Sequence, residues 1–442
     1  MMSQPALRVL FISGQDGGTR RYRCDHPQAQ LEPHGIATGF REASDLRLLA
    51  DALDYDVFIL HRVPYSDLIG RVLEWAQQLG KPALFETDDL IFEPDLVEYD
   101  GHYRSLPPDE ARAYERKVQL HLKTLAQCDY ALTTTEYLAE ALRRRGQPTF
   151  VHRNALGTEF VRLAQELQRP HVEHVDKRVV IGYVSGSVSH DQDFATITDA
   201  LLHVLNRRPN VELLVIGPLN LSERFTSVAQ QVRMRPLLPW KDIPRESQTI
   251  DINLAPLELD NPFCQSKSEV KYFEAGILGI PTVASPTDAF KFAIRHGETG
   301  FLAGNTHEWI ESLERLIDNP NLRRSIGAAA RRDALKNYVP QVRGRQLAPL
   351  LQTLADEHRR EPDNPAIQET VERQVIAYLT SVLEEVLSPS YPAALPRPYD
   401  DTLWRRRYLF EGRAELRDLQ RERGGRWLAG LMQRVIRSPH AK

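Results

Sequence analysis

Short apolar runs alternate with amphipathic stretches through the first two thirds of the chain. Runs of this length are typical of strands buried on both faces of a parallel sheet, and the stretches between them have the spacing of helices. In the first half, the expected strands are residues 7–13, 57–60, 83–85, 130–133 and 150–152. The pattern therefore predicts an α/β fold built on a parallel sheet.

A second series of strands follows a polar stretch at residues 166–178, where we expect a hinge. Its runs are VVIGYVS, VELLVIG, DINLAP and TVAS, separated by helical segments such as residues 194–207. The two series predict two doubly wound Rossmann-like domains, at residues 1–170 and 171–340, facing each other across a cleft. Open α/β sheets bind ligands beyond the carboxyl ends of their strands, so the loops at these ends are the expected site.

The pattern changes beyond residue 340. Residues 341–387 read as a crossover and a helical segment, and residues 388–400 contain four prolines and read as a linker. Residues 401–442 carry 11 basic and 5 acidic side chains, a net of +6, with apolar positions at helical spacing. This predicts a basic amphipathic helical tail that lies on an anionic membrane surface, self-associates, or packs on the domain core.

Composition indicates which kinds of partner and which cellular compartment to expect. The 442 residues include 56 Lys and Arg against 60 Asp and Glu, which gives no general electrostatic reason to bind nucleic acid. Three cysteines without C-x-x-C spacing argue against a disulfide framework and a cysteine-based zinc site. The amino terminus lacks the layout of a secretory signal, and no apolar run is long enough to span a bilayer. We expect a cytoplasmic protein, peripheral at most to the inner face of the cell membrane.

The most informative stretch is NPFCQSKSEVKYFEAGILGIPTVAS, at residues 261–285. Ser266 and Glu269 have the spacing of a capping box and Gly279 supplies a stop, which together predict one short helix. On that helix Lys267, Lys271 and Glu274 would share a face. Two ammonium groups and a helix amino terminus suit a diphosphate, and a carboxylate two turns on suits a ribose diol. The alternative is a solvated charged face.

A second candidate loop follows the first strand of the second half, in IGYVSGSVSHDQDF. Gly186 permits close backbone approach, and Ser187 and His190 can donate hydrogen bonds to an anion. We expect a phosphate cradle here. The alternative is that Ser189 or Asp191 only caps the helix and His190 is solvated.

The first half offers polar groups at three strand ends. The loop SGQDGGTRRYRC supplies flexible glycines and cations for an anion, and the alternative is a solvated basic loop. The strand ends FILHRVPY and FETDDLIF place an imidazole, a guanidinium and carboxylates, which suit sugar hydroxyls or a base. A helix cap explains the T-D-D spacing as well as a metal would, and we expect no metal. The candidates are Gly17, Gly18, Arg23, His61, Arg62, Glu86, Asp88 and Asp89.

These residues resemble a known family. The blocks EAGILGIPTVAS from Glu274 and GETGFL from Gly297 resemble the carboxyl domain of group 1 (glycogen-synthase-like) glycosyltransferases of the GT-B fold. Supporting matches are VVIGYVSGSVSHDQDF, VELLVIGP and TTTEYLAEALRRRGQPTFVHRNALG, and the resemblance covers about residues 7–345. YRCDHP and HRVPY make it closest to bacterial transferases that build surface polysaccharides.

The resemblance implies retaining, metal-independent transfer of a sugar from a nucleotide diphosphate donor to a saccharide or lipid-linked saccharide, without a cofactor. Glu274 matches the second glutamate of the family's E-x7-E motif, which holds the donor ribose, whereas Ser266 replaces the first. His61, Lys267 and Lys271 would be catalytic. The donor set would be Gly17, Gly18, Arg23, Gly186, Ser187, His190, Ser266 and Glu274, and the acceptor-side set Arg62, Asp88 and Asp89.

Two other functions stay open at this point. Ser266 in place of a glutamate is compatible with a catalytically inactive subunit that binds a sugar nucleotide or a partner enzyme. An epimerase of the same fold is the other alternative. The motifs G-x-S-x-G, G-x-x-x-x-G-K-[ST] and H-E-x-x-H are absent from the sequence, which argues against serine hydrolases, P-loop nucleotidases and zinc peptidases.

Overall fold

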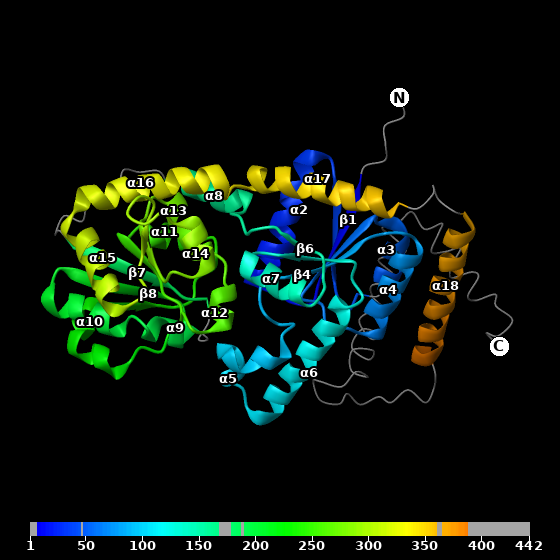
Figure 1. The fold of residues 1–442 in the computed structure, drawn as a ribbon, viewed down its shortest axis with the longest axis horizontal. Coiled ribbons are helices and arrows are strands. Elements are labelled where there is room, and N and C mark those ends of the chain that lie inside the picture. The colour runs from blue at the N-terminus through cyan, green and yellow to red at the C-terminus, as the bar shows by residue number, and fades with distance from the viewer. Residues whose placement is uncertain (1–6, 46, 168–177, 187–189, 360–364, 388–442) are drawn as a thin grey trace.

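The computed structural model of the chain describes residues 7–45, 47–167, 178–186, 190–359 and 365–387. Figure 1 shows two α/β halves side by side, with long helices running along one edge of both. We call the elements around the first sheet the first domain and those around the second sheet the second domain.

The first sheet has six parallel strands in the order β2-β1-β3-β4-β5-β6. Every residue of β3 and β4 is buried, which explains their continuous apolar runs. The strands are β1(Arg8–Ser13), β2(Ala37–Glu42), β3(Val57–His61), β4(Ala83–Thr87), β5(Tyr130–Thr133) and β6(Thr149–Val151). The helical elements between and after them are α1(Gly18–Arg20), η1(Arg21–Asp25), α2(His26–Leu31), η2(Glu32–His34), α3(Leu48–Asp54), α4(Asp67–Gln78), η3(Pro94–Tyr99), α5(Gly101–Arg104), α6(Pro108–Leu125), α7(Glu136–Arg144) and α8(Thr158–Glu166).

The second sheet also has six parallel strands, in the order β12-β11-β10-β7-β8-β9. They are β7(Val179–Val184), β8(Val211–Ile216), β9(Val232–Arg235), β10(Ile252–Ala255), β11(Thr282–Ala284) and β12(Phe301–Leu302). The accompanying helical elements are α9(Asp191–Ala195), α10(Thr198–Arg207), η5(Glu223–Gln231), α11(Ile243–Ser247), α12(Pro262–Ser266), α13(Val270–Ile277), α14(Asp288–Ala293), α15(Thr306–Asp318) and α16(Pro320–Asn337).

Strand order fixes where a ligand would lie. In the first sheet the chain reverses its winding direction between β1 and β3, and in the second sheet it does so between β7 and β10. At such switch points the connections leave in opposite directions, which opens a crevice at the carboxyl ends of the strands. The loops after β1, β3, β7 and β10 therefore border the expected site.

The chain crosses between the domains more than once. Phe160 and Ala164 of α8 pack in one cluster with Tyr272 and Phe273 of the second domain. Helix α17(Pro340–His358) returns to the first domain, where it packs on α2 and buries Leu351. Helix α18(Pro365–Leu387) then lies against α3 and α4 (Figure 1).

The structure confirms the α/β class, the two parallel sheets and the helical carboxyl-terminal region. The sequence pattern does not predict β2, β9 or β12. Strands β2 and β9 are edge strands without a buried position, and β12 has only two residues, so none of the three leaves a buried apolar run. The segment expected as one helix at residues 194–207 is divided between α9 and α10. Most of the expected hinge, the linker at 388–400 and the tail at 401–442 lie outside the described residues.

Candidate functional site

The segment predicted as one capped helix is broken in the structure. Helix α12 ends at Ser266, the residues up to Glu269 are not helical, and α13 begins at Val270. The predicted capping box is therefore wrong. The Ser266 hydroxyl donates to the Phe263 carbonyl (2.7 Å), at the end of the preceding helix instead of the start of the next. Gly279, with φ of 78°, does follow the end of α13 as predicted.

The Glu269 carboxylate has long-range partners in place of a capping role. Glu269 is completely buried and accepts a hydrogen bond from the Tyr338 hydroxyl (3.0 Å). The Arg153 guanidinium lies 3.4 Å away. Both partners are distant in sequence, 69 residues away for Tyr338 and 116 for Arg153, so the carboxylate serves tertiary contacts and not a local cap.

Lys271 and Glu274 share α13, but Lys267 does not share their face. The Lys271 ammonium donates to the carbonyl of Val184 at the carboxyl end of β7 and lies 4.4 Å from the centroid of the Tyr183 ring. Burial lowers the pKa of Lys271 to about 8, although Asp193 and Glu274 oppose the shift. Lys271 is thus held at the second switch point as a cation that loses its proton readily.

Glu274 faces the first domain. Its carboxylate accepts a hydrogen bond from the hydroxyl of Tyr22 on η1. Burial raises the pKa of Glu274, and the Tyr22 hydrogen bond opposes that shift. Burial and the Glu274 charge raise the pKa of Tyr22 well above its ordinary value, so the phenol stays protonated as the donor.

Lys267 crosses to the first domain as well. Its ammonium donates to Asp89 Oδ2 (2.7 Å), and the Ser266 hydroxyl lies 3.3 Å from Asp89 Oδ1. Burial would lower the pKa of Lys267, but the Asp89 carboxylate raises it above its ordinary value. Lys267, expected on the donor side, and Asp89, expected on the acceptor side, therefore form one ion pair.

A buried polar group lies at the first switch point, which we call the His61 cluster: His61, Glu86 and Asp88. His61 Nε2 is 3.9 Å from Glu86 Oε2 and 3.8 Å from Asp88 Oδ1. His61 Nε2 and Glu86 Oε2 have no hydrogen-bond partner in the part of the chain that the structure describes. Burial raises the pKa of Glu86, against the Arg23 charge.

The other ring nitrogen of His61 contacts the end of β1. His61 Nδ1 lies 2.8 Å from the oxygen of Ser13, and the Ser13 hydroxyl donates its own hydrogen to the Gln15 carbonyl (2.7 Å). His61 is thus anchored at Ser13 through Nδ1, while Nε2 faces the carboxylates of Glu86 and Asp88. Imidazole and carboxylate groups placed together in this way are suited to hydrogen bonds with hydroxyl groups.

Arg62 holds the carboxylates that follow β4. Its φ of 47° is the one positive value at a non-glycine residue within the described ranges. Its guanidinium donates to Asp88 Oδ1 (2.6 Å) and lies 3.5 Å from Asp89 Oδ2. Burial would lower the pKa of Arg62, but these carboxylates raise it. Likewise burial would raise the pKa of Asp88, but Arg62 lowers it well below its ordinary range, so Asp88 is ionised.

The loop expected after β1 is largely helical, as α1 and η1. Gly17, with φ of 83°, precedes α1, and Gly18 begins it; both are exposed. Arg23 is instead buried, with its Nε donating to Glu86 Oε1 (2.6 Å) and its Nη1 to Asn154 Oδ1 (2.8 Å). Arg23 therefore supports the His61 cluster through Glu86 and is not the open-loop cation that the sequence predicts.

The expected phosphate cradle after β7 is described in part. Gly186 is exposed, and Ser187 lies outside the described residues. His190 is the residue before α9, and its Nδ1 lies 3.1 Å from Asp193 Oδ2. Burial lowers the pKa of His190, although the hydrogen bond to Asp193 opposes this.

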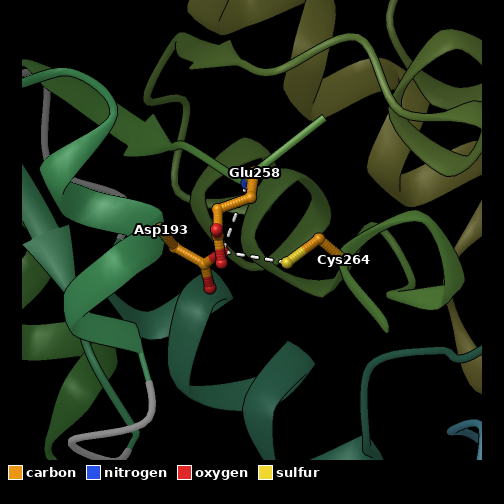
Figure 2. A group of neighbouring side chains, drawn as sticks. All are labelled: Asp193, Glu258 and Cys264. Carbon is orange, nitrogen blue, oxygen red and sulfur yellow. Dashed lines mark hydrogen bonds between the residues drawn. The ribbon is translucent and has the colours of Figure 1, made fainter. Parts of the chain in front are cut away.

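Asp193 also belongs to a compact group with Glu258 and Cys264, shown in Figure 2, whose ligand atoms lie within 4.8 Å of one another. The Cys264 thiol donates to Asp193 Oδ1 (3.1 Å), and the Glu258 amide lies 3.3 Å from the same oxygen. The group is small enough to hold a metal ion. Its hydrogen bonds satisfy the Asp193 carboxylate without one, and all three cysteines of the chain are free and buried.

Several residues of the site are not identified as functional by the sequence: Tyr22, Arg153, Asp193, Glu258, Cys264 and Glu269. Tyr22 and Asp193 lie inside the motifs YRCDHP and IGYVSGSVSHDQDF, in which other residues are the predicted functional ones. Their partners are distant in sequence, 252 residues away for Tyr22 and 71 for Cys264 with Asp193, so spacing carries no signal for them. No helix in the described ranges is long and apolar enough to cross a membrane.

Comparison with known proteins adds two sequence findings. Residues 178–319 match the family model described as glycosyl transferases group 1. Trehalose synthase of Pyrococcus horikoshii is 33% identical over 66 residues. The matched stretch is 15% of this chain and spans 16% of that relative's length.

Solved structures resemble the chain over most of its length. HepE of Anabaena in complex with UDP and glucose matches with a TM-score of 0.54 at 17% identity, over 78% of this chain and all of that one. Sucrose-phosphate synthase of Thermosynechococcus elongatus matches with a TM-score of 0.54 at 14% identity, over 79% and 100%. A glycosyltransferase of Rickettsia africae matches with the same TM-score at 12% identity, over 79% and 99%. At these identities the likeness concerns the fold.

Proposed function

We propose that the protein is a glycosyltransferase, because the chain has the GT-B fold and residues 178–319 match the family model of group 1 glycosyl transferases. It transfers a sugar from a nucleotide diphosphate donor to a saccharide or lipid-linked saccharide. The anomeric configuration is retained, and no metal or cofactor is required. The acceptor belongs to the synthesis of a bacterial surface polysaccharide.

One observation carries this proposal. Lys267, from the segment suited to a diphosphate, contacts Asp89, which adjoins the cluster suited to sugar hydroxyls. This contact supports a single site for both kinds of recognition, between the carboxyl ends of the two sheets. The complex of HepE with UDP and glucose supports a uridine diphosphate sugar as the first donor to test.

The second domain supplies the chemistry for the leaving group. Cleavage of the bond to the donor sugar leaves negative charge on the diphosphate, and fixed cations stabilise that charge as it develops. Lys267 and Lys271 supply these positive charges without a metal. Glu274 binds the ribose hydroxyls, and Gly186, Ser187, Ser266 and His190 complete the donor set.

The first domain supplies the sugar contacts. The polar side chains of the His61 cluster form hydrogen bonds with sugar hydroxyls, with Arg62, Asp88 and Asp89 toward the acceptor. His61 then orients the sugar ring for transfer, and the Arg23 pair keeps Glu86 in place behind it. Gly17 and Gly18 follow β1 and border the same site.

A second function is favoured by one observation. Ser266 stands where the family motif has a glutamate, and its hydroxyl is engaged by Phe263 and Asp89. A side chain committed in this way supports a subunit that binds a sugar nucleotide without turning it over. The basic tail, which lies outside the described residues, would bring either form to an anionic membrane carrying a lipid-linked acceptor.

Donor turnover distinguishes the two functions. The test is release of nucleoside diphosphate from UDP-, GDP-, dTDP- and ADP-glucose by the wild type, Lys271→Ala and the exposed control Lys291→Ala. A transferase releases diphosphate from one donor by transfer or slow hydrolysis, and only Lys271→Ala loses it. Proton NMR of the product then reports the anomeric configuration. Release no faster than the uncatalysed rate from every donor, despite binding, would establish the inactive subunit instead.

A further inference from the structure

The first domain holds the 266–274 segment at five positions along its length. These contacts involve a carbonyl, an ammonium, a hydroxyl and two carboxylates, so the segment is fixed by polar groups and not only by packing. The contacts are Thr135 Oγ1 to the Ser266 carbonyl (3.3 Å), Asp89 to Lys267 (2.7 Å), Asn154 Nδ2 to Ser268 Oγ (2.8 Å), Arg153 to Glu269 (3.4 Å) and Tyr22 to Glu274.

Asp89 is itself rigidly placed. The Thr87 hydroxyl donates to the Asp89 carbonyl (2.7 Å) and accepts from the Asp89 amide (3.2 Å). The Leu90 amide donates to Asp89 Oδ1 (3.1 Å), and Arg62 lies beside Oδ2. With a side chain that is only 14% exposed, Asp89 presents an ordered carboxylate to the second domain.

Two of the five contacts engage groups that the donor would use. An oxygen of a carboxylate at 2.7 Å satisfies the Lys267 ammonium as a phosphate oxygen would. The Tyr22 hydroxyl satisfies the Glu274 carboxylate as a ribose hydroxyl would. In both pairs a first-domain side chain occupies the position that chemistry assigns to the ligand.

We infer that Asp89 and Tyr22 are internal competitors of the nucleotide donor. The diphosphate takes Lys267 from Asp89 and the ribose takes Glu274 from Tyr22, so the donor binds only as these contacts between the domains part. Donor binding is thereby coupled to a change in how the two domains meet at the 266–274 segment. The inference rests on the proposed function, since it assigns Lys267 and Glu274 to the donor.

The two possible roles of Asp89, competition and positioning, predict opposite changes in diphosphate affinity when its charge is removed. If Asp89 competes, removal of its charge frees Lys267 and strengthens diphosphate binding. If Asp89 instead holds Lys267 ready for the donor, the same change weakens binding. For a pair that is partly exposed, the expected gain is roughly three- to tenfold in Kd.

The experiment measures Kd for UDP, GDP, dTDP and ADP by isothermal titration calorimetry on the full chain. The variants are Asp89→Asn and Tyr22→Phe, and the control is Asp109→Asn, which removes an exposed charge on α6. Asp89→Asn and Tyr22→Phe each lower Kd about three- to tenfold, and Asp109→Asn leaves it within about twofold. The gain from Asp89→Asn disappears in a Lys267→Ala background, because the cation that it frees is gone.

The outcomes separate the inference from the function on which it rests. Wild-type binding of one diphosphate, with Asp89→Asn and Tyr22→Phe weaker or unchanged, overturns the competition and leaves the donor site standing. Failure of every diphosphate to bind the wild type and both variants overturns the donor site and the competition together. Should Asp89→Asn melt at a lower temperature than the wild type, Tyr22→Phe carries the test.

Discussion

Replacing Arg23 by methionine tests how the His61 cluster is supported. Arg23 and Glu86 form an ion pair at 2.6 Å, with side chains 1% and 0% exposed. Arg23→Met leaves the Glu86 carboxylate in a water-excluded site with one oxygen newly unpaired and the other already so. Breaking a buried pair from one side costs about 3–5 kcal/mol, because the remaining charge is neither solvated nor compensated.

The matched variant removes both charges. In Arg23→Met with Glu86→Gln, the amide that remains is neutral, so we expect the double variant to recover about 1–3 kcal/mol of the loss. The assay is urea unfolding followed by circular dichroism, with equal m values required before free energies are compared. A loss below about 1 kcal/mol for Arg23→Met, or a double variant less stable than the single one, would refute this view of the pair.

The same pair predicts a pH dependence. Burial already raises the pKa of Glu86, and loss of Arg23 removes a charge that lowers it. A carboxyl group whose folded-state pKa is raised is more favourable to the fold in its protonated form, so its contribution is present at low pH and lost as pH rises through the folded pKa. The instability of Arg23→Met is therefore smaller at pH 5 than at pH 8. An equal loss at both values would contradict the assignment.

Three further predictions concern the second domain. Gly217→Ala should lower the free energy of unfolding by about 1–3 kcal/mol, because φ is 99° and the new Cβ would lie 2.0 Å from the Ser185 carbonyl oxygen. The control Gly186→Ala, whose new Cβ meets no described atom within 4 Å, should change the free energy of unfolding by less than about 0.5 kcal/mol, and thermal melts compare the two variants. Diphosphate affinity should fall as pH rises above the Lys271 pKa of about 8, because only the protonated amine attracts the phosphates. A pH series of titrations with Lys271→Ala should lack this fall, and a fall of equal size in the variant would exclude Lys271 as its source. Removal of divalent ions with EDTA should leave donor turnover unchanged, and loss of activity restored by one metal would point instead to Asp193, Glu258 and Cys264.

The fold could be predicted because its information is local. Strands such as β3 and β4 are buried along their whole length, so they appear as continuous apolar runs between helical patterns. The edge strands β2 and β9 lack that burial and leave no such run. Strand order placed the site at the carboxyl ends of the sheets once the parallel arrangement was known.

The side-chain partners could not be predicted because they are not local. Ser266 and Glu269 have the spacing of a capping box, but the Glu269 carboxylate contacts Tyr338 and Arg153 instead of a backbone amide, and the helix is broken there. Arg23 was expected in an open loop because its neighbours are glycine and arginine, whereas burial against Glu86 and Asn154 depends on how three distant segments pack. Spacing identifies elements, and tertiary packing decides which of their polar groups meet.

The proposed function depends above all on a nucleotide donor site at Lys267, Lys271 and Glu274. A thermal-shift panel of UDP, GDP, dTDP and ADP, with EDTA or with magnesium, tests it most directly on the wild type, Lys271→Ala and Lys291→Ala. We expect one diphosphate to raise the melting temperature of the wild type and of Lys291→Ala without magnesium, and Lys271→Ala to lose the increase. No increase with any diphosphate, or an equal increase in Lys271→Ala, would contradict it.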